Sequence, residues 1–217
     1  MLNGKKAIFL GDSITEGAGV SDMRNVYWNR VGEELGLIVK GYGVGGTRIA
    51  DQKQEPNLEW HETFIERAKR MDKDADIVCV FGGTNDYGHG DAPIGHIENS
   101  TSDTFYGALN VLFTYLSETY PEAHIFVLTP MHRLNEDDPR GDGYKYPTLP
   151  LSGYVQIIRE VAEKYALPVV DLYKNSGIQP AVDVLREKYM PDGLHPNDRG
   201  HEKIAALVTA HLKAFLG

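Results

Sequence analysis

The segment FLGDSITEG, residues 9–17, ends an apolar run abruptly at Gly11 and continues with Asp12 and Ser13. The apolar run indicates a buried strand, and the two polar residues stand where that strand ends. Asp and Ser are also favoured helix caps, because a side-chain oxygen accepts hydrogen bonds from N–H groups of the first turn. A catalytic role for Ser13 therefore depends on which other residues converge on the end of this strand.

Short apolar segments alternate with longer amphipathic segments along the whole chain. The apolar segments predict strands at 5–11, 37–43, 75–83, 123–130 and 167–172. Apolar spacings of three and four predict helices near 25–36, 58–71, 102–119, 152–166 and 198–215, and a shorter one near 180–188. Strands that are apolar on both faces and separated by helices form parallel sheets covered on both sides. The predicted fold class is therefore α/β, a three-layer α/β/α sandwich around a five-stranded parallel sheet.

The composition limits how many domains the chain forms and which kinds of partner it binds. A chain of 217 residues with 41% hydrophobic residues can bury one sizeable core, which predicts a single domain over residues 1–217. A net charge of -9 disfavours nucleic acid and anionic membrane surfaces as partners. Cys79, the single cysteine, excludes an internal disulfide and is interpreted as core filler. The oligomeric state is left open.

Targeting signals are missing from the sequence as given. Its apolar segments are too short to span a bilayer, and the longest one near the N-terminus is too short for the core of a signal peptide. We therefore expect a cytoplasmic protein without a membrane span. A leader peptide removed earlier would leave no trace in this sequence, so the expectation applies to the chain as given.

Polar and glycine-rich segments follow the predicted strands. Ligands of open α/β sheets bind outside the carboxyl ends of the strands. Ser13 follows the first strand, GVGGT (43–47) the second, GGTND (82–86) the third, and the long irregular segment 131–152 the fourth. The segment MPDGLHPND (190–198) precedes the last helix and can reach the same edge. These segments together predict a binding site at that edge.

Acyl transfer would use residues from four of these segments, all but 131–152. Ser13 needs a base, for which His195 is the best candidate, and Asp192 is placed to hold the imidazole in the right tautomer. The N–H groups of Ser13 and Gly46 and the amide of Asn85 are candidate donors to the oxyanion. Taken singly, each motif also has an ordinary explanation as a glycine turn, an Asx turn or a turn before a helix.

In their order and spacing, GDSIT (11–15), GVGGT (43–47), GGTND (82–86) and DGLHPN (192–197) resemble the conserved blocks of the SGNH hydrolases, also called the GDSL-type esterase/lipase family. The resemblance spans residues 7 to about 205 and implies a flavodoxin-like SGNH hydrolase fold. It implies Ser13 as nucleophile, His195 as base, Asp192 as its orienting partner, and Ser13, Gly46 and Asn85 as the oxyanion hole, with no metal or cofactor. The family often has Asn where this chain has Gly41.

The substrate class is inferred from the segments nearest the predicted site. Segments 86–96 and 132–146 are predicted to be polar loops, which favours a hydroxyl-rich substrate such as a carbohydrate carrying a small acyl group, acetyl above all. Candidate substrate contacts are Asp12, His89, Asp91, His132 and Arg133. The alternative within the family is a lysophospholipase or thioesterase.

Two readings without ester hydrolysis are also open. A non-catalytic ligand-binding module would have lost a member of the triad, and none is lost. A nucleotide binder would carry a phosphate-cradling motif of the type G-x-G-x-x-G or G-x-x-x-x-G-K-[ST], and the sequence has neither.

Overall fold

A five-stranded parallel sheet lies at the centre of the molecule. The computed structural model describes residues 2–53, 62–139 and 149–217. The strands run in the order β2-β1-β3-β4-β5, and every neighbouring pair is parallel. Their bounds are β1 Lys6–Gly11, β2 Ile38–Gly43, β3 Ile77–Phe81, β4 His124–Leu128 and β5 Val169–Val170. The predicted sheet is confirmed, with β5 shorter than the segment 167–172 suggested.

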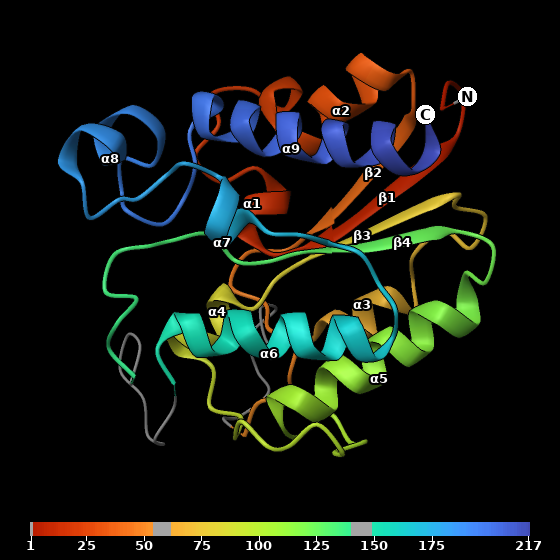
Figure 1. The fold of residues 1–217 in the computed structure, drawn as a ribbon, viewed down its shortest axis with the longest axis vertical. Helices are drawn as coiled ribbons and strands as arrows, with labels where there is room; N and C mark the ends of the chain where they lie inside the picture. The colour runs from red at the N-terminus through yellow and green to blue at the C-terminus, as the bar shows by residue number, and fades with distance from the viewer. Residues whose placement is uncertain (1, 54–61, 140–148) are drawn as a thin grey trace.

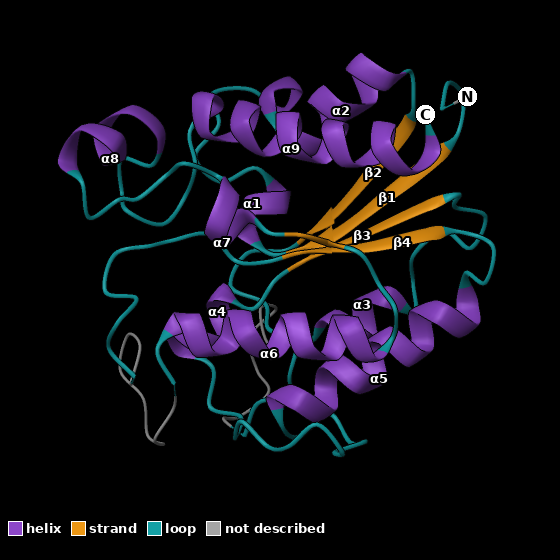
Figure 2. Cartoon of the chain, viewed as in Figure 1, coloured by secondary structure: helices purple, strands orange, loops and turns teal. Residues whose placement is uncertain are grey.

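Helices cover both faces of the sheet (Figures 1 and 2). The upper face in Figure 1 carries α2 (Tyr27–Leu35) and α9 (Asp198–Leu216), and the lower face carries α3 (Phe64–Ala68), α5 (Phe105–Thr119) and α6 (Leu151–Lys164). Shorter helices are α1 (Ser13–Glu16), η1 (Met23–Asn25), α4 (Thr84–His89), α7 (Leu172–Asn175) and α8 (Asp183–Tyr189). The predicted three-layer α/β/α sandwich is confirmed.

The sheet separates two apolar cores. Successive residues of β1 point to opposite faces, so Ala7 and Phe9 pack with α2 and α9, whereas Ile8 and Leu10 pack with α3, α5 and α6. Each large apolar side chain buried in this way stabilises the fold by about 1.5–3 kcal/mol. Cys79 lies buried and unpaired in β3, in agreement with its interpretation as core filler.

Two local predictions were wrong. The polar segment 86–96 is not a loop throughout, because its first residues belong to α4 and both Asp86 and Asp91 are buried. The carboxylate of Asp86 accepts hydrogen bonds from the N–H groups of Ile49 and Ala50, which compensates for its removal from water. The helix predicted over 58–71 is limited to α3 among the described residues, and residues 58–61 lie outside them.

The irregular segment after β4 is described only in part. Of the predicted irregular segment 131–152, residues 131–139 and 149–150 contain neither helix nor strand, residues 140–148 lie outside the described residues, and residues 151–152 begin α6. None of the helices in the described ranges has the length and hydropathy needed to cross a membrane.

Candidate active site

Ser13 is the first residue of α1, directly beyond the end of β1. Asp12 caps this helix, since its Oδ1 accepts a hydrogen bond of 3.0 Å from the N–H of Ile14. The short helix packs so closely on β2 that a Cβ atom at Gly43 would lie 2.0 Å from the backbone nitrogen of Glu16. The glycine at the end of β2 thus allows α1 to approach the carboxyl edge of the sheet, where it holds Ser13.

His195 reaches Ser13 from the segment before α9. Its Nε2 lies 3.0 Å from the Oγ of Ser13, and its Nδ1 lies 2.7 Å from the Oδ2 of Asp192. The Oδ1 of Asp192 accepts hydrogen bonds from the N–H groups of Leu194 and His195, so the carboxylate and the imidazole belong to one local turn. The structure therefore brings together the three residues that the sequence predicted as a triad.

Asp192 is ionised more easily than an ordinary aspartate. Burial opposes its ionisation, but hydrogen bonds from the N–H groups of His195 and Leu194 and from the His195 ring outweigh burial and hold the pKa of Asp192 below its usual value. A carboxylate facing Nδ1 favours the tautomer with the proton on Nδ1, which leaves Nε2 as an acceptor toward Ser13.

The turn that carries His195 is anchored on both sides. Asn197 caps α9, because its Oδ1 accepts hydrogen bonds from the N–H groups of Arg199 and Gly200. On the other side, the N–H of Leu134 donates to the carbonyl of Gly193 over 2.9 Å. The segment after β4 thus lies against the turn that holds His195.

Gly46 and Asn85 belong to neighbouring segments that are joined to each other. Gly46 has a φ of 73°, in the left-handed region that glycine tolerates best. Asn85 lies in the first turn of α4, and its Nδ2 donates to the carbonyl of Thr47 over 3.1 Å. The carboxylate of Asp86 strengthens this junction, because it accepts hydrogen bonds from the N–H groups of Ile49 and Ala50 in the loop after β2. The loop after β2 is therefore docked on the start of α4.

A buried arginine that sequence analysis missed joins the same loops. Arg67 of α3 donates to the carbonyls of Gly11 and Tyr42 and to the hydroxyl of Thr47. Its signal in the sequence is a charged residue on the apolar face of a helix, three residues after the buried Phe64. Burial raises the pKa of Asp12 to about 6, although the N–H of Ile14 and the Arg67 cation oppose the rise.

The predicted substrate contacts all have partners within the chain. The Oδ1 of buried Asp12 accepts from the N–H of Ile14, the Oδ1 of Asp91 accepts from the N–H of Lys53, and the Nδ1 of His132 lies 2.7 Å from the Oε1 of Glu136. Arg133 is buried, and its Nη1 donates to the carbonyl of Thr84. His89 contacts Arg48 and Asn85. Contact of these five side chains with a substrate stays a prediction.

Gly41, where the family often has Asn, lies under the indole of Trp28. A Cβ atom at this position would come within 2.5 Å of the ring. The indole Nε1 donates to the carbonyl of Thr15 in α1 over 2.9 Å. The indole therefore fills the space that a side chain at position 41 would need, and it supports the helix that begins with Ser13.

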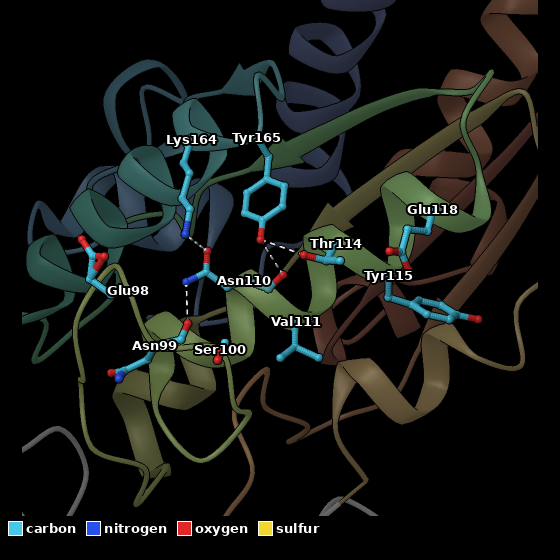
Figure 3. A pocket seen from close by; sticks show the side chains of 10 residues that line it. All are labelled: Glu98, Asn99, Ser100, Asn110, Val111, Thr114, Tyr115, Glu118, Lys164 and Tyr165. Carbon is cyan, nitrogen blue, oxygen red and sulfur yellow. Dashed lines mark hydrogen bonds between the residues drawn. The ribbon is translucent and has the colours of Figure 1, made fainter.

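A cavity of about 400 Å³ lies apart from these residues, along α5 and the end of α6 (Figure 3). Polar groups in its wall are hydrogen-bonded to one another: Lys164 donates to the Oδ1 of Asn110, and the hydroxyl of Tyr165 donates to the carbonyl of Asn110. None of the predicted site residues lines this cavity. In the described part of the chain, no three His, Cys, Asp or Glu side chains gather as a metal site.

The chain is similar to known proteins in its sequence and in its fold. The sequence model of the GDSL-like lipase/acylhydrolase family matches residues 9–203. A protein of solved structure from Lactobacillus plantarum is 26% identical, with a TM-score of 0.85 and 100% coverage of both chains. The lipase/acylhydrolase from Enterococcus faecalis is 23% identical over 97% of this chain and 96% of that one, with a TM-score of 0.64.

The fold is shared with a further esterase. The acetyl xylan esterase AlAXEase is 21% identical over 95% of this chain and 99% of that one, with a TM-score of 0.61. No curated protein matches the chain. Because the family match covers most of the sequence, the chain belongs to the GDSL-like lipase/acylhydrolase family and is a carboxylic ester hydrolase.

Proposed function

We propose that this protein is a serine esterase that removes small O-acyl groups, acetyl above all, from carbohydrates. The observation that carries the proposal is the continuous hydrogen-bonded arrangement of Ser13, His195 and Asp192, with contacts of 3.0 Å and 2.7 Å. This is the arrangement of nucleophile, base and orienting carboxylate that a serine hydrolase needs.

The reaction follows from the roles of these groups. Nε2 of His195 takes the hydroxyl proton of Ser13 as Oγ attacks the ester carbonyl, and Asp192 stabilises the imidazolium that forms. The carbonyl oxygen gains negative charge and is stabilised by the N–H groups of Ser13 and Gly46 and by the amide of Asn85. The tetrahedral intermediate collapses as His195 protonates the leaving alcohol, which leaves an acyl group on Ser13. Water, deprotonated by His195, then releases the carboxylic acid.

The preference for a hydroxyl-rich substrate is supported by a cavity next to the turn that carries His195. This cavity of about 650 Å³ is lined by residues 133–138, Gln179 and Ala181, most of which are polar or charged. Leu134 in its wall is hydrogen-bonded to Gly193, two residues from His195. Side chains of this kind can hydrogen-bond sugar hydroxyls, whereas a long acyl chain gains from apolar walls.

The chain-length preference of the enzyme tests the substrate class. We expect kcat/KM for acetyl esters of one chromophore to equal or exceed that for butyryl esters, and to far exceed that for octanoyl esters. In an apolar groove each added methylene would contribute about 0.8 kcal/mol, a gain that polar walls do not provide. Acetylated xylose is measured beside the chromogenic esters. A preference for octanoyl esters would contradict the carbohydrate substrate and favour a lysophospholipase or thioesterase.

Substitution of the nucleophile tests the mechanism separately. Ser13→Ala is expected to abolish hydrolysis of the acetyl ester, because the hydroxyl is the attacking group, while the circular dichroism spectrum stays unchanged. Ser152→Ala, at an exposed position of α6, is the matched control and is expected to keep full activity. A folded Ser13→Ala variant with the original rate would rule out Ser13 as nucleophile.

A further inference from the structure

Three side chains form a hydrogen-bonded row behind the candidate oxyanion hole. Nη1 of Arg48 lies 2.8 Å from Nδ1 of His89, and Nε2 of His89 lies 3.2 Å from Oδ1 of Asn85. His89 and Asn85 are four residues apart on α4 and so share one face of that helix. Arg48 comes from the loop after β2, the loop that also carries Gly46.

The chemistry of arginine fixes the tautomer of His89. A guanidinium has only N–H donors, so Nδ1 of His89 must offer its lone pair to Arg48. In a neutral imidazole the proton is then on Nε2, which donates to Oδ1 of Asn85. A doubly protonated ring would turn an N–H against the guanidinium and break the row.

Both ends of the Asn85 amide then specify the same orientation. Its oxygen accepts from Nε2 of His89, and its nitrogen donates one hydrogen to the carbonyl of Thr47. Rotating the amide by 180° would set two acceptors against each other at Thr47 and two donors against each other at His89. The amide is thereby locked with its nitrogen toward Thr47, and no acceptor among the described residues takes its second hydrogen, which can donate to an oxyanion.

Arg48 also reaches the second candidate donor. Its Nη1 donates to the carbonyl of Gly46 over 3.4 Å, and the side chain is buried. One guanidinium thus contacts the peptide of Gly46 directly and the amide of Asn85 through His89. A buried cation with these contacts couples the two segments that contribute to the oxyanion hole.

We propose that His89 and Arg48 are positioning residues that hold the amide of Asn85 and the backbone of Gly46 ready for the oxyanion. This inference rests on the proposed function, in which Asn85 and Gly46 stabilise the transition state. Donors that are fixed in advance stabilise the developing charge without a cost of reorganisation at the moment of reaction. Losing His89 leaves the amide of Asn85 in place but removes the hydrogen bond that fixes its orientation.

A double-mutant cycle on hydrolysis of the acetyl ester tests this role. We expect Asn85→Ala to lower kcat by about a hundredfold or more, and His89→Leu to lower kcat by about tenfold with KM changed less than twofold. In the Asn85→Ala background, His89→Leu is expected to have no further effect on kcat, because the group that it positions is gone. His96→Leu, at an exposed position, is the matched control and is expected to keep the original kcat.

The outcomes separate this inference from the proposed function. If Asn85→Ala alone leaves kcat unchanged, the oxyanion assignment fails and this inference fails with it. If Asn85→Ala is slow but the two effects multiply in the double variant, or folded His89→Leu keeps its original kcat, only the positioning role is overturned.

A second substitution covers the case in which His89→Leu does not fold. His89→Gln retains a donor and an acceptor at the end of a side chain of similar reach. It is expected to keep a larger share of kcat than His89→Leu, or at least a third of the original kcat if His89→Leu is unfolded. A folded His89→Gln variant that is as slow as Asn85→Ala would overturn the proposal.

Discussion

Asp192 performs two tasks with its two carboxylate oxygens. One oxygen accepts the N–H groups of Leu194 and His195 and so shapes the turn, and the other accepts from the imidazole. The backbone bonds need only an acceptor, which an amide oxygen also supplies. The contact with the ring needs an acceptor at the second position, which an amide nitrogen cannot provide.

Asp192→Asn is therefore expected to keep the turn and lose catalysis. An amide nitrogen facing Nδ1 forces the proton onto Nε2, and Nε2 can then no longer accept the proton of Ser13. We expect kcat for the acetyl ester to fall by roughly 10²–10⁴-fold with an unchanged melting temperature. Asp183→Asn, at an exposed position in α8, is the control. An active Asp192→Asn variant would show that Asp192 does not set the tautomer.

Among individual residues, the sequence predicted the candidates for the triad but missed the arginines that support the surrounding loops. Ser13, Asp192 and His195 stand in short motifs whose chemistry limits what they can do. Arg48 and Arg67 look like ordinary surface charges in the sequence, because Arg67 donates to carbonyls of β1 and β2 and Arg48 contacts His89 of α4, which are all distant in the sequence. A buried charge of this kind depends on tertiary structure, which no local pattern encodes.

The long helices and the shorter helix α8 followed their patterns, whereas α1 and α4 were not predicted. α5, α6 and α9 begin and end close to the predicted residues, because each has several turns of regular apolar spacing. α1 and α4 are too short to be stable alone and form because neighbouring segments hold their ends. Prediction of such helices would require knowledge of those neighbours.

The N-terminus of α9 supports both the helix and the turn that holds His195. Asn197→Ala removes the cap on the N–H groups of Arg199 and Gly200 and the hydrogen bond from Nδ2 to the carbonyl of Lys188. We expect the free energy of unfolding to fall by about 1–2 kcal/mol in urea titrations. Asn175→Ala, at an exposed position, is the control. An unchanged unfolding midpoint for Asn197→Ala would mean that the cap adds nothing to stability.

Buried ionisable groups make the stability of the molecule depend on pH, and the carboxyl groups and His201 do so in opposite directions. Burial raises the pKa of Asp12 and of Asp86 to about 6 and lowers the pKa of His201 to about 4. The carboxyl groups contribute stability below their unfolded pKa of about 3.8, and this is lost as the pH rises through about 6. His201 contributes stability above its unfolded pKa of about 6.5, and this is lost as the pH falls through about 4.

Asp12→Asn isolates one of these contributions. The amide keeps an acceptor for the N–H of Ile14 but cannot ionise, and the contribution of His201 is common to both proteins and cancels. The difference in free energy of unfolding between the variant and the original protein is expected to shift in favour of the variant by on the order of 1–3 kcal/mol from pH 4 to pH 7. Urea unfolding at both pH values measures this gain, with Asp74→Asn at an exposed position as the control. An equal stability difference at the two pH values would contradict the raised pKa of Asp12.

The separation of Ser13 and His195 by 182 residues has a consequence for biosynthesis. At about 5–20 residues per second, a ribosome adds the base about 10 to 40 s after the nucleophile. Under the proposed mechanism, the nascent chain carries the nucleophile without its base throughout that interval, and a product that terminates before His195 is expected to be inert. If Ser13 and His195 act as proposed, hydrolysis can therefore begin only after residue 195 has been added and has folded against the end of β1.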